Sequence, residues 1–195
     1  GRDGFGDGLL KLLQAEGVDT RSLIVDPQDH TALAFVSLSD RGDPDFAIFT
    51  GASTNLAPTD LDSELISTAR IFHFGTVLMA FEPSRAATLE AIRIAKVANV
   101  LVSCDPNWRP AIWTDQARGL ATMKEAIALA DIIKMNADEL RLVAGEQDLH
   151  KALESLNVPA MLVAVTMSEK GCMYRFNGDI YTQPVPVVED VVDAT

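Results

Sequence analysis

The sequence has few cysteines, few basic residues and no long apolar run. Its two cysteines, Cys104 and Cys172, cannot form a disulfide scaffold, and both lie in apolar segments typical of buried free thiols in a reducing compartment. No apolar run reaches the roughly 18 residues of a membrane span. Lys and Arg total 16 against 28 Asp and Glu, a net charge of -12, which disfavours a protein that coats DNA or RNA. A phosphorylated small molecule remains compatible with this charge.

The chain is long enough to bury a core of its own. It has 195 residues, of which 48% are apolar. At roughly 150 residues per domain, this length predicts a little over one domain. The chain begins without Met or a signal peptide and stops on the strand-like run 191–195, so we expect an internal piece of a longer protein.

The first third of the chain predicts a helix followed by a hairpin. Leucines between residues 9 and 13 form a helical stripe that ends at Gly17. Residues 31–38 and 46–49 are strand-like and flank turn residues at 40–44. The expected division of the chain is 1–30 as the start of an α/β core domain, 31–53 as an inserted hairpin and 54–195 as the rest of the core.

From residue 71 onward, strands and helices are predicted to alternate. The expected strands are 71–77, 100–104, 132–135 and 161–165, and the expected helices are 83–98, 115–130, 136–144 and 151–156. Continuous apolar strands separated by helices predict an α/β fold whose parallel sheet is covered on both faces. The β-rich segment 171–192, with a turn at Asn177-Gly178, predicts an antiparallel edge. His73, within an apolar strand, is interpreted as a core histidine.

Polar, turn-prone residues follow each expected parallel strand. They are Gly75-Thr76, Asp105–Arg109, Asn136–Glu139 and Thr166–Gly171. In open α/β sheets the ligand binds beyond the carboxyl ends of the strands, so these segments are the candidate site.

Each candidate segment has a structural interpretation beside the functional one. Asp105, Asn107 and Arg109 could direct a carboxylate, an amide and a guanidinium into one cleft, or could form a solvated loop shaped by prolines. Asn136 and Glu139 form a capping box, which stability alone can explain, or place Glu139 near a hydrated magnesium ion.

The turn at 166–171 is equally open to two interpretations. Its backbone N–H groups could approach a nucleotide phosphate or ribose. Alternatively, it is an ordinary turn that Gly171 closes.

Taken together, four motifs in order resemble the ribokinase/pfkB family of carbohydrate kinases, and its fructokinase branch most. The motifs are Gly-x-Asp-x-Phe-Gly at 1–6, Asp-Pro-Asn-x-Arg at 105–109, Asn-x-x-Glu at 136–139 and Thr-x-x-x-x-Gly at 166–171. The resemblance covers essentially the whole chain, and the hairpin matches the family's β lid over the sugar. It implies a ribokinase-like three-layer αβα fold and an ATP-dependent transfer of the γ-phosphoryl group to a sugar hydroxyl, with fructose as the first candidate.

The resemblance also implies roles for individual residues. Arg109, Asn107 and Asp105 would lie near the sugar or the transferring phosphate. The nucleotide site would be lined by Asn136, Thr166, Ser168, Glu169 and Gly171. Glu139 and Asn136 would form the magnesium region, and Asp193 and Thr195 would help hold a monovalent cation. The implied cofactors are ATP, magnesium and potassium.

The same resemblance and composition set the expected partners and location. We expect a small sugar as ligand, no nucleic acid, no membrane, and a homodimer through the lid sheet. The expected location is the cytoplasm, or the plastid in a plant.

The sequence departs from the family pattern in three places. The family's signature stops at Thr195, before the Gly-Ala-Gly-Asp that supplies the anion hole and the catalytic Asp. The N-terminal strand and glycine pair that supply a sugar-binding Asp are missing, and Ser168 stands where the family usually has Gly. With no catalytic base expected among these residues, we expect the chain alone to be inactive or nearly so.

Two alternatives to a fructokinase remain at this point. One is a non-catalytic kinase remnant that binds a sugar or a partner. The other is a 2-keto-3-deoxygluconate or nucleoside kinase of the same family.

Overall fold

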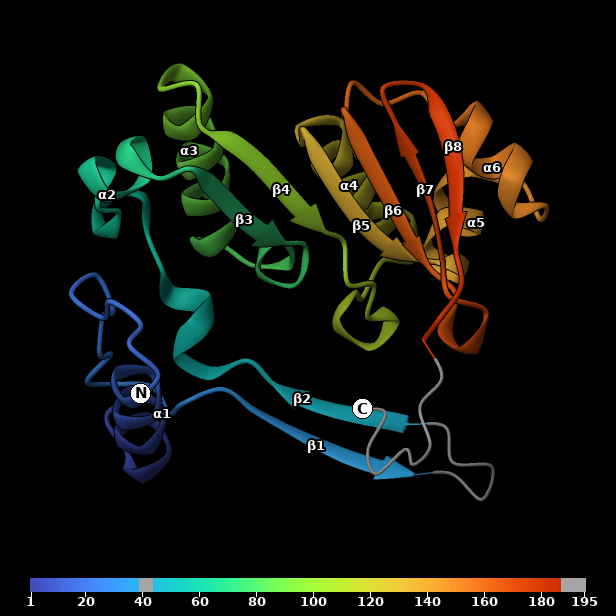
Figure 1. The fold of residues 1–195 in the computed structure, drawn as a ribbon. Coiled ribbons are helices and arrows are strands. Elements are labelled where there is room, and N and C mark those ends of the chain that lie inside the picture. The colour runs from blue at the N-terminus through green and yellow to red at the C-terminus, as the bar shows by residue number, and fades with distance from the viewer. Residues whose placement is uncertain (39–43, 187–195) are drawn as a thin grey trace.

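The computed structural model describes residues 1–38 and 44–186 (Figure 1). The N-terminal part contains α1 (Gly4–Ala15) and a hairpin of β1 (Leu33–Leu38) and β2 (Pro44–Phe49), which pair antiparallel. A connection containing the short helix α2 (Ser63–Thr68) leads into a six-stranded sheet. Figure 1 shows the N-terminal part lying beyond the carboxyl ends of the sheet's first strands.

The sheet has the strand order β3-β4-β5-β6-β7-β8. Its strands are β3 (Ile71–Gly75), β4 (Leu101–Asp105), β5 (Ile132–Asn136), β6 (Leu162–Thr166), β7 (Cys172–Phe176) and β8 (Asp179–Gln183). The first four are parallel and the last two antiparallel, which confirms both the alternating pattern and the antiparallel edge. Asn177 and Gly178 both have positive φ, as the tight turn between β7 and β8 requires.

The helices that accompany the sheet are α3 (Ser84–Val97), α4 (Gln116–Ala128), α5 (Ala137–Ala144) and α6 (Leu149–Ser155). Several helices begin or end at capping residues. Asp3 caps α1 by accepting from the Gly6 N–H at 2.9 Å, and the helix closes at Gly17, whose φ is +74°. Helix α5 likewise starts at Asn136 and closes at Gly145. The predicted strand from residue 71 ends at Gly75 because Val77–Ala80 form a 3-10 turn.

Within the described residues, the four longer sheet helices α3 to α6 lie on one face of the sheet (Figure 1). The side chains that point toward them form the core and are fully buried: Val102, Cys104, Ile133, Met135, Val163 and Val165. The alternate positions are partly or largely exposed, and His73 and Lys134 are among the exposed ones. This differs from the expected coverage of both faces, because the apolar runs conceal a period-2 pattern in which every second residue is polar, small or partly exposed.

The expectation that His73 is a core histidine is wrong. His73 lies on the open face of β3, where its Nδ1 is 3.1 Å from the Ser103 hydroxyl on β4. A strand of alternating burial places one residue in two toward solvent, and His73 falls at such a position.

The buried core of the described residues lies in the sheet part. Every fully buried apolar side chain there is at residue 74 or later, and Thr31 is the one buried residue before it. The N-terminal part instead exposes large apolar side chains, namely Phe5, Leu9, Leu12, Ile24 and Phe35. None of the helices in 1–38 and 44–186 is both long and apolar enough to cross a membrane.

Candidate functional site

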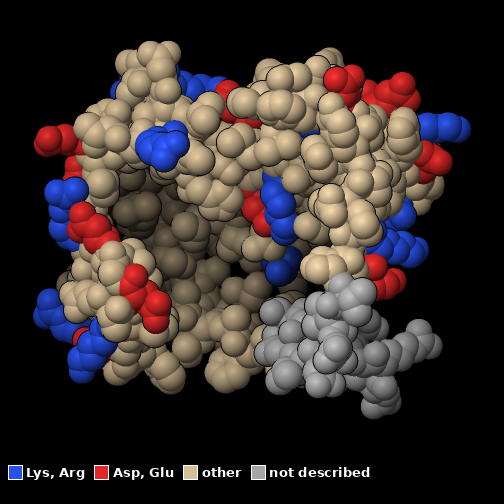
Figure 2. Space-filling model, viewed as in Figure 1, with Lys and Arg blue, Asp and Glu red and all other residues tan. Residues whose placement is uncertain are grey.

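The four candidate segments lie along one edge of the sheet, at the carboxyl ends of β3 to β6. Gly75 lies opposite Asp105 in the register, and Asn136 lies opposite Thr166. The Lys134 ammonium joins two of these strands, because it donates to Asp105 Oδ2 at 2.9 Å. Figure 2 shows a hollow between the N-terminal part and the sheet, with basic and acidic side chains adjacent on its wall. The roles of these residues stay a prediction.

The loop after β4 is held from both ends. Asp105 Oδ1 accepts from the Asn107 N–H at 3.1 Å, and Asn107 adopts a left-handed conformation with φ of +49°. Asn tolerates this conformation better than most residues, which explains its position in the loop. On the β3 side, the buried Thr76 donates from both its N–H and its hydroxyl to the Pro106 carbonyl.

Arg109 reaches from this loop to the inserted hairpin. Its Nη1 donates to the Trp108 carbonyl at 3.1 Å, and its guanidinium carbon lies 5.0 Å from the centre of the Phe46 ring in β2. A guanidinium has five N–H donors, so these contacts leave it able to bind an anionic oxygen as well. The structure therefore places Arg109 between the strand ends and the hairpin.

Glu139, in the first turn of α5, is buried, with 4% of its surface exposed. Its Oε2 accepts from the Asn136 N–H at 2.8 Å, and the Asn136 side chain accepts from the Glu139 N–H at 2.9 Å. This is the capping box that the sequence predicts. Its Oε1 accepts from the Trp108 N–H at 2.6 Å, a bond to the neighbouring strand-end loop that the sequence did not reveal.

The predicted magnesium region does not fit direct coordination by Glu139. Both carboxylate oxygens already accept backbone N–H groups, and the Asn136 amide oxygen is engaged in the cap. In the described part of the chain, no three or more His, Cys, Asp or Glu side chains come together as a metal site would need. Magnesium is often held mainly by substrate phosphates and water, which requires no such cage. The assignment of Glu139 to the magnesium region stays a prediction.

The 166–171 turn is exposed along one side and tightly packed at its end. Ser168 has φ of +51°, the left-handed region that favours the glycine usual in the family. Gly171 has φ of +86°, and a Cβ there would lie 2.1 Å from the Gln183 carbonyl oxygen. The packing of β8 alone therefore requires Gly171 to be glycine. Thr166, Ser168 and Glu169 are exposed at the edge of the sheet.

Cys104 lies directly before this edge and has an unreactive thiol. It is fully buried in β4, and burial, together with the nearby charges of Asp105 and Glu139, raises the pKa of its thiol to about 12. The prediction of a buried free thiol is confirmed for Cys104, whereas Cys172 is only partly buried. The predicted monovalent-cation residues Asp193 and Thr195 lie outside the described residues.

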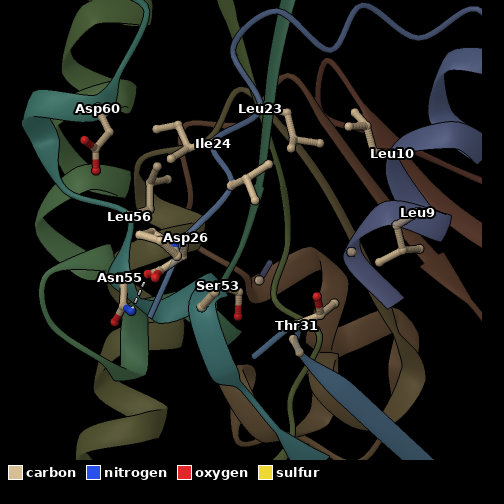
Figure 3. A pocket seen from close by; sticks show the side chains of 16 residues that line it. Leu9, Leu10, Leu23, Ile24, Asp26, Thr31, Ser53, Asn55, Leu56 and Asp60 are labelled. Atoms are coloured by element: carbon tan, nitrogen blue, oxygen red, sulfur yellow. Dashed lines mark hydrogen bonds between the residues drawn. The ribbon is translucent and has the colours of Figure 1, made fainter. Parts of the chain in front are cut away.

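One hollow adjoins the site, and a second lies in the N-terminal part. The first, of about 510 Å³, lies beside β3 and is lined by Gly75, Asp105 and Asn107 together with apolar side chains. The other, of about 480 Å³, belongs to the N-terminal part and was not predicted (Figure 3). Its apolar wall is formed by Leu9, Leu10, Leu23, Ile24 and Leu56. These residues come from three separate segments and form no motif, so no local pattern could have indicated the hollow.

A comparison with known families gives a match over the whole chain. The model of the pfkB family carbohydrate kinases matches residues 1–195. A curated relative, "Probable fructokinase-3" of Arabidopsis thaliana, is 36% identical over 100% of this chain and 57% of its own length. The chain therefore spans well under two thirds of this relative.

Solved structures agree with that match. An uncharacterized sugar kinase from Pyrococcus horikoshii in complex with ATP superposes with a TM-score of 0.85, at 29% identity over 97% of this chain and 60% of that one. A double mutant of the fructokinase from Vibrio cholerae O395, bound to fructose, ADP and a potassium ion, also has a TM-score of 0.85. It is 28% identical over 97% of this chain and 61% of that chain. The ribokinase-like α/β fold is thereby confirmed.

Proposed function

Because this chain belongs to the pfkB family of carbohydrate kinases, we propose that it supplies the phosphate-transfer edge of an ATP-dependent sugar kinase that uses fructose. The observation that carries the proposal is the convergence of three polar loops, after β4, β5 and β6, at one sheet edge. Two cations, Lys134 and Arg109, lie there in a chain whose net charge is -12. Because Lys134 pairs with Asp105, the Arg109 guanidinium stays available at the strand ends for a phosphate oxygen.

In the proposed reaction the sugar hydroxyl oxygen forms a bond to the γ-phosphorus of ATP. The bond from that phosphorus to the β–γ bridging oxygen breaks, ADP leaves, and the hydroxyl proton passes to a base. The identity of this base is predicted from the family resemblance alone. Such transfers depend mainly on positioning and on stabilising the charge of the moving phosphoryl group.

Arg109 is assigned to the moving phosphoryl group or the sugar. It projects from the loop toward the hairpin, where a guanidinium can bind two phosphate oxygens at once. Asp105 and Asn107 lie in the same loop and are joined by a hydrogen bond. Lys134 pairs with the Asp105 carboxylate, so that carboxylate does not offset the charge of Arg109. Truncation of Arg109 should therefore weaken the binding of phosphate groups.

The 166–171 turn is assigned to the nucleotide. Thr166, Ser168 and Glu169 are exposed beside Asn136 at the sheet edge, where they can contact ribose and phosphate. The Vibrio cholerae structure is bound to ADP and a potassium ion, so we propose ADP or ATP and a potassium ion as the cofactors of this protein. Magnesium is proposed on the family resemblance alone. A sugar in the hollow of Figure 2 would lie between this edge and the hairpin.

The hairpin of residues 31–53 is proposed to act as a lid and as a dimer contact. Phe46 meets Arg109 on one side of the hairpin, while Phe35 and Phe49 pack edge to face at 5.8 Å and are both largely exposed. An exposed aromatic pair on a two-stranded sheet favours association with a second copy. Placement in the cytoplasm or plastid stays a prediction.

Calorimetric titration of the 195-residue chain with ADP, magnesium and potassium tests the proposal. We expect ADP to bind, and Arg109→Ala to weaken binding by at least about tenfold, as loss of a charged hydrogen bond does. The matched control is Arg93→Ala, an exposed arginine of α3 paired with Glu90. Absence of ADP binding, or equal weakening by both substitutions, contradicts the proposal.

A thermal-unfolding panel then tests the sugar. Fructose, 2-keto-3-deoxygluconate and adenosine are compared with ADP present, since a ligand at 100 times its Kd adds about 2.7 kcal/mol of stability. We expect fructose to give the largest shift. A larger shift with either of the others would assign the chain to another branch of the family. A coupled kinase assay tests the separate prediction that this chain alone turns over slowly or not at all.

A further inference from the structure

We propose that Glu139 is a positioning residue that fixes the loop carrying Arg109 and does not coordinate the metal. The proposal rests on the assignment of Arg109 to a phosphate group under the proposed function. Glu139 is the one charged side chain that is buried in the described part of the chain. A charge in such a place needs hydrogen-bond partners, and its partners therefore indicate its role.

The carboxylate of Glu139 joins two strand-end loops. Oε2 accepts from the Asn136 N–H at 2.8 Å and Oε1 from the Trp108 N–H at 2.6 Å. The first bond completes a helix cap within three residues, but the second spans 31 positions in the sequence. A capping box needs only the first bond, so the second is a feature that stability of α5 does not explain.

Trp108 transmits this constraint to Arg109. The Trp108 N–H donates to Glu139 and has no other acceptor among residues 1–38 and 44–186. The Trp108 carbonyl accepts from Arg109 Nη1 at 3.1 Å, while the guanidinium lies on the Phe46 ring. The backbone N–H that Glu139 holds thus belongs to the residue directly before Arg109, and its position constrains where the Arg109 side chain starts.

The same two bonds argue against a direct metal ligand. A carboxylate that coordinates magnesium directs an oxygen at the ion, which also retains several waters. Both oxygens of Glu139 instead face backbone N–H groups, in a site with little solvent access. Breaking either bond would leave a buried N–H without a partner, which is unfavourable.

The experiment compares the wild-type chain with Glu139→Gln in buffer free of metal and nucleotide. A carboxamide has one acceptor oxygen, so Gln can satisfy only one of the two N–H groups, and we expect it to keep the local cap bond to Asn136 and to lose the long-range bond to Trp108. By amide NMR, we expect the Trp108 proton to move upfield from its hydrogen-bonded position in this variant. We also expect its hydrogen exchange to accelerate at least about tenfold. The Arg109 Nε resonance should shift too, which a purely local cap would not cause.

The matched control is Asp138→Asn, the neighbouring acidic residue of α5, whose side chain is 92% exposed. We expect it to leave the Trp108 and Arg109 signals unchanged. Unchanged Trp108 signals in Glu139→Gln would overturn the proposal, as would an effect that appears only when magnesium is added.

A measurement on the wild-type chain covers the case in which Glu139→Gln does not fold. The Trp108 amide, which lies in a loop outside any strand, should exchange at least about tenfold more slowly than an unbonded amide, without metal. Magnesium alone should not move the Trp108 and Asn136 resonances. Fast exchange of the Trp108 amide, or a shift of either resonance when magnesium is added, would contradict the proposal. If these results hold and ADP still fails to bind, the positioning role stands and the proposed function falls.

Discussion

The sheet part and the N-terminal part of this molecule hold their shape by different means. In the sheet part, alternate residues of β4, β5 and β6 pack against helices and are completely buried. In the N-terminal part, α1 has no buried residue, and two of its leucines, Leu9 and Leu10, line the open hollow of Figure 3. Burial of apolar area is the main source of folding free energy, so the two parts should differ in stability.

Polar contacts take the place of a core in the N-terminal part. Asp3 accepts from the Gly6 N–H, the Thr31 N–H and the Thr31 hydroxyl, which ties the start of α1 to the start of the hairpin. Asn55 donates to both Asp26 and Asp29. In the N-terminal part, Asp3 and Asn55 therefore fix the geometry through hydrogen bonds, whereas the buried apolar side chains of the sheet part supply most of the stability.

A matched pair of leucine truncations should show the largest contrast. Leu140 of α5 is 0% exposed, whereas Leu12 of α1 is 57% exposed. We expect Leu140→Ala to lower the free energy of unfolding by about 2–5 kcal/mol, and Leu12→Ala by no more than about 0.5 kcal/mol. Urea denaturation measures both. Equal losses would show that the N-terminal part has a core of its own.

Acid should loosen the N-terminal part first. Hydrogen bonds lower the pKa of Asp3, chiefly from the Thr31 N–H, and that of Asp26 to about 2, chiefly from the Asn55 side chain. A backbone N–H lowers the pKa of Asp62 as well. Because these pKa values lie below the unfolded value of about 3.9, their stabilising contribution is complete above that pH and is lost as the pH falls from there toward 2.

Amide-exchange protection at several pH values measures this effect. We expect α1 and β1 to lose protection between about pH 4 and pH 2, before β4 and β5 do. The sheet part also has lowered carboxyl pKa values, at Glu90 and Asp148, but these lie on exposed helix surfaces away from its core. Simultaneous loss in both parts would contradict the distinction.

Removal of the Asp3 side chain should act locally. Asp3→Ala deletes the cap of α1 and the bonds to Thr31, so we expect amides in the first turns of α1 to exchange about fivefold faster, the size of a typical helix cap. Exchange in the sheet should not change. Asp7→Ala, in the same turn, is the control. A global loss of protection with Asp3→Ala would mean that the two parts unfold together.

The contact between the two parts should give the smallest effect. Phe46→Leu removes the ring beneath the Arg109 guanidinium, a contact of about 0.5–1 kcal/mol at an exposed site. The Arg109 Nε resonance should shift with loss of the ring current. Phe35→Leu, on the same hairpin, should leave this resonance in place. A larger shift with the Phe35 variant would show that Phe46 is not the ring that contacts the Arg109 guanidinium.

Much of the fold follows from the sequence because its signals are local. The capping box at Asn136, the closing glycine Gly145 and the turn at Asn177-Gly178 each depend on neighbours within a few residues. The alternation of strands and helices likewise predicted the parallel sheet and the strand-end loops.

The remaining features depend on residues far apart in the chain. A capping box fully explains the Asn-x-x-Glu motif at 136–139, so that motif gives no indication of the bond from the Trp108 N–H to Glu139. The need for glycine at residue 171 comes from the Gln183 carbonyl on another strand. The exposure of His73 follows from which face the helices cover, which the apolar run of β3 does not indicate.

An amide NMR map of the 195-residue chain titrated with ADP and magnesium would show whether the three strand-end loops form one ligand site. We expect the largest shifts to fall together in 105–109, 136–139 and 166–171, since these loops share one sheet edge. Shifts confined to residues around the hollow of Leu9 and Ile24, or scattered over the helices, would contradict it.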